Sequence, residues 1–97
     1  MKLHQFYELP VRSKLEMLDD ISLIIHYLHT GKRSMAEPLI QDLKTRAVFL
    51  SEQIQQDVLI FASQVHFQYD YDPWHIITPG VQTAADRLIR DLGFKIY

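Results

Sequence analysis

Histidines and aspartates that lie close together in the sequence are the first candidates for chemistry. The stretch HFQYDYDPWHIITPG, residues 66–80, contains His66, Asp70, Asp72 and His75. Two imidazoles and two carboxylates could together hold a zinc or a non-haem iron ion. A structural explanation competes, because Asp72 followed by Pro73 is a typical start of a helical turn, with the aspartate as its cap.

A second pair of histidines, His26 and His29, lies near the end of the first predicted helix. Residues three apart share a helix face, so both rings could bind one metal ion. A third ligand would have to come from elsewhere, since Asp19 is two helical turns away. Both rings also suit the partial negative charge at a helix C-terminus, which is the simpler role. We therefore expect no metal and no cofactor. A metal- or cofactor-binding helical protein that uses these histidines and aspartates is the alternative.

Large aromatic side chains are concentrated in the same 66–80 stretch. Tyrosine and tryptophan are enriched at the centres of protein interfaces. We predict a loop here, in which Tyr69, Tyr71, Trp74 and His75 form a partner-binding surface. In the competing interpretation the tyrosines and Trp74 only cover the end of a helical bundle, while the aspartates face water. An extended YDYD segment would place Tyr69 and Tyr71 on one face.

Composition and motifs argue against several classes of function. The 97-residue chain has no cysteine, which excludes disulfides, thiolate catalysis and cysteine-bound metals. Its three scattered glycines cannot form a phosphate-binding loop, and no G-x-S-x-G nucleophile motif is present. A net charge of -2 argues against an electrostatic grip on nucleic acid. No secretory signal or membrane-spanning run is visible. We expect a cytoplasmic protein that is not an enzyme and binds neither nucleic acid nor membrane.

Glycines and prolines divide the chain into three predicted helical segments. The first covers about residues 10–30, and the third runs from the cap residue Thr78 to a terminating glycine at 93. The last residues, FKIY, are predicted either to pack back on the core or to pair as a short strand with LHQFY near the N-terminus.

The middle segment is predicted to be one continuous helix over residues 35–66, with Ser34 and Glu37 as a capping box at its start. Apolar residues recur every eleven positions, close to the repeat of a straight helix. They are Ala36, Ala47 and Val58; Leu39, Leu50 and Phe61; and Leu43, Ile54 and Val65. The polar run SEQIQQD could interrupt the helix, but nothing in it requires a break. Such a helix would be about 48 Å long, longer than a compact chain of this size.

Two further apolar pairs lie outside that stripe, again eleven residues apart: Val48 with Leu59, and Phe49 with Ile60. Two short neighbouring helices cannot cover so long a helix on every side. We therefore predict that these four residues form a dimer or partner surface. The chain is expected to be a homodimer, with a heterologous protein partner as the other possibility.

These patterns predict a single all-α domain. Its expected architecture is a small antiparallel bundle built on one long central helix flanked by two shorter helices, and completed by dimerisation. The expected function is that of a small non-catalytic protein-interaction module, which acts as a regulator, adaptor or inhibitor of a partner protein.

Overall fold

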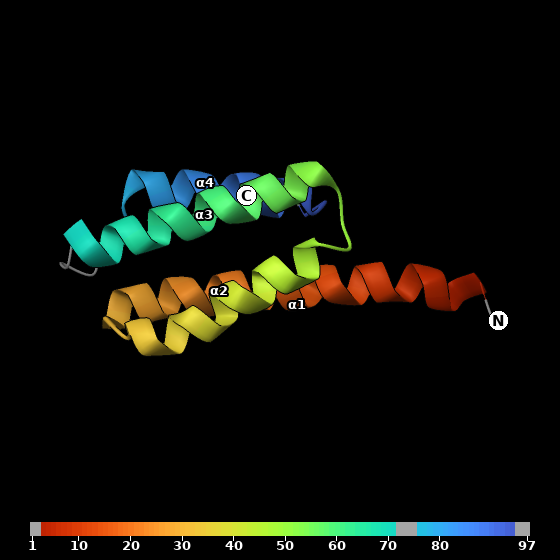
Figure 1. Cartoon of the computed structure of the whole chain (residues 1–97), viewed down its shortest axis with the longest axis horizontal. Coiled ribbons are helices and arrows are strands. Elements are labelled where there is room, and N and C mark those ends of the chain that lie inside the picture. Colours follow the sequence, from red (N-terminus) through yellow and green to blue (C-terminus); the bar gives the residue numbers. More distant parts are fainter. Residues whose placement is uncertain (1–2, 72–75, 95–97) are drawn as a thin grey trace.

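The computed structural model describes residues 3–71 and 76–94, with side chains from residue 13 onwards, and within them the chain forms four helices and no strand. The helices are α1 (Leu3–Thr30), α2 (Arg33–Ala47), α3 (Glu52–Tyr71) and α4 (Pro79–Asp91). The predicted all-α class is thus confirmed for this part of the chain. Consecutive helices run in opposite directions along the 50 Å long axis of the molecule (Figure 1).

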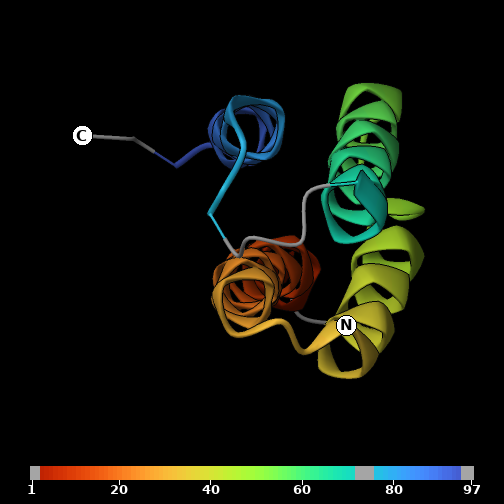
Figure 2. The same cartoon turned by 90° about the vertical axis from the view of Figure 1, so that its left-hand side faces the viewer.

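The helices are arranged as two antiparallel hairpins. Seen end-on, α1 and α2 form one pair and α3 and α4 the other, with α2 beside α3 (Figure 2). The N-terminal end of α1 extends beyond the other three helices (Figure 1). All four helices contribute to one apolar core, in which Ile24, Leu43, Phe61 and Leu88 are fully buried.

The predicted continuous helix over residues 35–66 is wrong, because the chain turns at residues 48–51 between α2 and α3. Ser51 helps to start α3, since its Oγ accepts a hydrogen bond from the backbone N–H of Ile54 at 3.3 Å, as a helix cap does. The side-chain amide of Gln55 donates to the carbonyl of Leu50 at 3.3 Å and closes the turn. The fold is therefore built from two helical hairpins, and not from one long central helix with a shorter helix on either side. Because the long helix is absent, its length is no longer a reason to expect a dimer.

The eleven-residue apolar repeat nevertheless marks the core. Seven of its nine members are no more than 5% exposed: Ala36, Leu43, Ala47, Ile54, Val58, Phe61 and Val65. Leu39 and Leu50 are partly buried and pack against the same core. The repeat survives the turn because each of the two helices must bury its own apolar stripe against the shared core.

The ends of α1 and α4 form as the sequence predicts. Gly31 has φ +70° and Gly93 has φ +98°, the left-handed conformation that glycine adopts without strain after a helix. At the start of α4, Thr78 Oγ1 accepts a hydrogen bond from the N–H of Val81 at 3.2 Å, and Pro79 is the first helical residue. These signals act through neighbouring residues, which is why the sequence alone locates these two helix ends and the start of α4.

The start of α1 differs from the prediction, since the helix begins at Leu3 and runs through Pro10. Proline costs the helix one backbone hydrogen bond there, but each further residue of an existing helix adds a bond of its own. Because residues 3–7 are helical, strand pairing between LHQFY and FKIY is wrong. Phe94 packs against the core, and residues 95–97 lie outside the described residues.

Candidate functional site

The predicted ligands His66 and Asp70 lie at the end of the bundle where α2 begins and α3 ends. Arg33 donates hydrogen bonds to Asp70 Oδ1 through Nη1 at 2.5 Å and to Glu37 Oε1 through Nε at 3.4 Å. His66 Nε2 lies 2.9 Å from Glu37 Oε1. Glu37 is therefore not part of a capping box with Ser34, because α2 already begins at Arg33 and no side chain caps its start. The four paired side chains join α2 to α3.

This network is open to water, so it adds little to stability. The hydrogen bond with Asp70 is the main reason that the pKa of Arg33 is raised above its ordinary value. The Arg33 guanidinium also lies 5.6 Å from the centre of the Tyr69 ring, a cation–π distance. Burial raises the pKa of Tyr69, whose hydroxyl is buried without a hydrogen-bond partner. Tyr69 thus contributes a packed ring to the end of the bundle.

A metal site that uses these histidines and aspartates is the alternative prediction. Among the side chains that the structure describes, those of residues 13–71 and 76–94, no three His, Asp or Glu are grouped closely enough to hold a metal ion. His26 and His29 lie on the exposed side of α1, where the His26 ring is tilted against Tyr27 with 5.6 Å between centroids. Asp72 and His75 lie outside the described residues.

Of the four residues predicted as a partner-binding surface, the structure describes Tyr69 and Tyr71. α3 continues through Tyr71, so Tyr69 and Tyr71 are helical and the predicted shared face of an extended segment is wrong. Tyr69 packs against the core, whereas Tyr71 is 74% exposed. Trp74 and His75 lie outside the described residues. The connection between α3 and α4 therefore begins after Tyr71, five residues later than predicted.

Gln68, for which we made no prediction from the sequence, binds the backbone of two residues that precede α4. Its side chain is 1% exposed. Its Nε2 donates to the carbonyl of Ile76 at 3.0 Å, and its Oε1 accepts from the N–H of Thr78 at 3.0 Å. Its position three residues after Val65, on the apolar stripe of α3, was the available signal. A buried amide on a core stripe needs partners that the chain must supply.

Replacing Gln68 by alanine is expected to lower the free energy of unfolding by about 1–3 kcal/mol, because the Ile76 carbonyl and the Thr78 N–H lose their partner. Urea titration followed by circular dichroism measures the loss. Gln41→Ala, at an exposed position of α2, is the matched control and should change stability by about 0.5 kcal/mol or less. Equal losses in both variants would contradict the role given to Gln68.

Large apolar side chains lie on the side of α3 that faces away from the core. Leu59, Ile60 and Phe67 are between 43% and 57% exposed, and with Tyr71 they define what we call the α3 outer face. The Phe67 and Tyr71 rings contact each other with 4.9 Å between centroids. In the turn before α3, Val48 is 63% and Phe49 85% exposed. All four residues predicted as a dimer or partner surface are thus exposed in the single chain, by between 43% and 85%: Val48, Phe49, Leu59 and Ile60.

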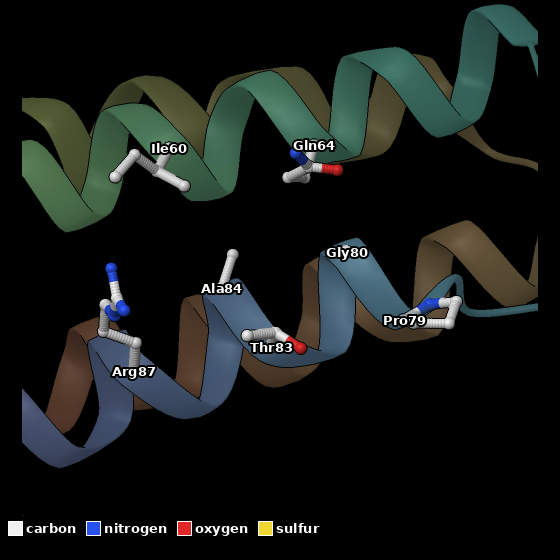
Figure 3. A pocket seen from close by; sticks show the side chains of 7 residues that line it. All are labelled: Ile60, Gln64, Pro79, Gly80, Thr83, Ala84 and Arg87. Atoms are coloured by element: carbon white, nitrogen blue, oxygen red, sulfur yellow. The ribbon is translucent and has the colours of Figure 1, made fainter.

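A groove of about 370 Å³ between α3 and α4 borders the α3 outer face (Figure 3). It is lined by Ile60 and Gln64 of α3 and by Pro79, Gly80, Thr83, Ala84 and Arg87 of α4. A Cβ atom at Gly80 would lie 2.3 Å from Gln64 Oε1, so the glycine lets the Gln64 side chain lie close against the backbone of α4. Arg87 carries the only charge among these lining side chains.

Two buried aspartates were also not singled out from the sequence. Asp20 of α1 is 8% exposed, and one of its carboxyl oxygens has no hydrogen-bond partner. It faces Asp42 of α2, whose carboxylate accepts a 2.8 Å hydrogen bond from Arg46. Arg46 also forms an ion pair with Glu16. Burial, followed by the hydrogen bond with Asp42, raises the pKa of Asp20 to about 7.

Asp57 repeats this arrangement in the other hairpin. It is 1% exposed, has one carboxyl oxygen without a partner, and accepts a 3.1 Å hydrogen bond from Gln53. Burial, followed by the hydrogen bond with Asp91 of α4, raises the pKa of Asp57 to about 6, and the nearby Arg87 opposes this shift. Asp57 lies three residues after Ile54 and four before Phe61, so its place on a core stripe was visible in the sequence.

No protein-family model, curated protein or solved structure matches the chain. The part of the chain that the structure describes contains no helix with the length and apolar character that crossing a membrane requires. The α3 outer face and its neighbouring groove are therefore the features from which a function is inferred.

Proposed function

We propose that the chain is a small non-catalytic protein-interaction module that self-associates through the α3 outer face. The observation that carries this proposal is the exposure of Leu59, Ile60, Phe67 and Tyr71 along one side of one helix. Single-chain proteins rarely leave contiguous apolar patches larger than a few hundred Å² in contact with water, and larger patches mark interaction sites. Removing such surface from water is favourable by about 25 cal/mol per Å².

The exposed apolar surface is large enough for a stable interface. Taking about 200 Å² as the full surface of a large side chain, the α3 outer face together with Val48 and Phe49 exposes roughly 750 Å². A standard protein interface buries about 800 Å² on each partner. These side chains alone therefore supply most of the area that a dimer contact needs.

A regulatory, adaptor or inhibitory role in the cytoplasm remains part of the proposal. Tyr71, at the end of α3, belongs both to the outer face and to the partner-binding surface predicted from the sequence. Tyr69 is assigned to the packing of the bundle end instead, because its ring lies against the core. The cysteine-free composition is consistent with a reducing compartment.

Phe67→Glu is expected to convert the dimer to a monomer, because the new carboxylate would be buried without a partner in an apolar contact. The fold should be retained, since Phe67 is exposed in the single chain. Size-exclusion elution measures assembly, and thermal melting followed by circular dichroism checks the fold. Leu23→Glu, at an exposed position of α1, is the matched control and should elute as the wild type does. An unchanged elution volume for Phe67→Glu would contradict the proposed surface.

A further inference from the structure

We infer that the α3 outer face binds a second copy of the same chain in antiparallel orientation, with the two-fold axis passing between residues 63 and 64. This inference rests on the self-association proposed above. It adds the orientation of the second copy and the register of the contact.

A row of uncharged residues, which we call the seam, runs along the exposed side of α3 and includes Ile60, Phe67 and Tyr71 of the outer face. Gln56, Ile60, Ser63, Phe67 and Tyr71 are exposed and follow each other at spacings of four, three, four and four. These spacings place them along one line on the helix surface, as in helices that pack side by side. A charged residue in the seam would have to lose its water on association, so an uncharged seam suits close helix packing.

The seam complements itself when two copies run in opposite directions. In a two-fold contact, residue i of one copy meets residue j of the other, and the reverse pair forms as well. With the axis between residues 63 and 64, Ile60 meets Phe67 of the second copy, so apolar side chains cover each other. Gln56 meets Tyr71 of the second copy, and the amide can hydrogen-bond the tyrosine hydroxyl. Each favourable pair therefore occurs twice.

The centre of the seam suits a close approach. Ser63 is small, so the two α3 helices can pack near the lower end of the usual separation of about 8–10 Å. The groove beside Ile60 offers space for the Phe67 ring of the second copy (Figure 3).

A parallel arrangement lacks this match. Each residue would then meet its own copy, so Gln56 would face Gln56 and Ile60 would no longer cover Phe67. Parallel helices also place like ends of their dipoles side by side, whereas antiparallel helices pair opposite ends.

Cysteine cross-linking tests the orientation directly, because the chain has no cysteine of its own. Ile60→Cys and Phe67→Cys chains, one of them labelled with ¹⁵N, are mixed, exchanged and oxidised mildly, and the disulfide-linked dimers are identified by mass spectrometry. Antiparallel packing is expected to give mainly mixed dimers, in which an Ile60→Cys chain is joined to a Phe67→Cys chain. Each variant oxidised alone should give few dimers. Leu23→Cys on α1 sets the background of random cross-linking.

Ile60→Cys and Phe67→Cys each remove a large apolar side chain from the proposed contact. A further variant tests the contact with these side chains in place. Ser63→Cys keeps every large apolar residue of the seam and lies beside the axis, so it is expected to cross-link with itself well above the Leu23→Cys background. Self-linked Ile60→Cys and Phe67→Cys dimers would overturn the antiparallel orientation while leaving self-association standing. A dimeric mass with only background cross-linking at all three seam positions would overturn the register. A monomeric wild type would overturn both the inference and the proposed self-association.

Discussion

Phe61→Ala is expected to lower the free energy of unfolding by about 3–5 kcal/mol. Phe61 is fully buried in the core shared by the four described helices. Removing its ring leaves a cavity that closely packed neighbours fill only in part. Since domains of this size are stable by about 5–15 kcal/mol, the variant should lose a large share of its stability. Urea unfolding followed by circular dichroism measures the change.

The matched control is the same substitution six residues later on the same helix. Phe67 is 57% exposed in the single chain, so Phe67→Ala removes little intramolecular packing. Any loss that it causes should depend on protein concentration, because it would come from a weakened dimer. The loss in Phe61→Ala should persist on dilution. A loss below about 1 kcal/mol for Phe61→Ala would mean that the core side of α3 is misplaced.

The free energy of unfolding is expected to fall by an amount on the order of 4 kcal/mol as the pH rises from 5 to 8. The pKa values of Asp20 and Asp57 are raised in the folded chain to about 7 and about 6, from 3.8. A carboxyl with a higher pKa in the folded state holds its proton more tightly there. Its stabilising contribution is therefore complete below the unfolded pKa and is lost as the pH rises through the folded pKa. Asp42, whose pKa is lowered chiefly by the hydrogen bond with Asp20, is ionised throughout this pH window.

Asp20→Asn removes the larger of the two contributions to the pH dependence of stability, so it measures that contribution separately. The amide keeps the shape of the protonated carboxyl and cannot ionise beside Asp42, so stability should depend less on pH between 5 and 8. At pH 8 the variant should be at least as stable as the wild type. Asp19→Asn makes the same chemical change at the exposed neighbouring position and should leave the wild-type pH profile unchanged. An unaltered profile in Asp20→Asn would contradict the explanation. Urea unfolding at several pH values measures all three chains.

The spacing of apolar residues predicts the helical class and most of the core, because each helix must bury one stripe. It does not predict the turn at residues 48–51. An eleven-residue repeat is the same for one straight helix and for two antiparallel helices that share a core. Ser51 is the cap that starts α3, but its hydroxyl is a weak local signal beside the apolar run of Val48, Phe49 and Leu50. The choice between helix and turn is made by packing against α1 and α4, which lie far away in the sequence.

Long-range contacts also explain what the sequence missed at the candidate site. Glu37 fits a local capping box, yet in the fold it binds His66, which is 29 residues away. The apolar repeat predicts Ile60 as part of a partner surface. It does not predict Phe67 there, because the sequence indicates a loop after His66. Only the continuation of α3 through Tyr71 places Phe67 and Ile60 on one face. The buried Asp20 could have been predicted from its position between Met17 and Ile24 on a core stripe.

The mass of the wild-type chain in solution tests the proposed self-association most directly. Light scattering coupled to size exclusion, at several protein concentrations, is expected to give twice the 11.5 kDa of one chain. Dilution should shift the mass toward that of a monomer if the contact is limited to the α3 outer face and the adjoining turn. A constant mass of 11.5 kDa at every concentration would contradict the account, because the apolar side of α3 would then stay exposed to water.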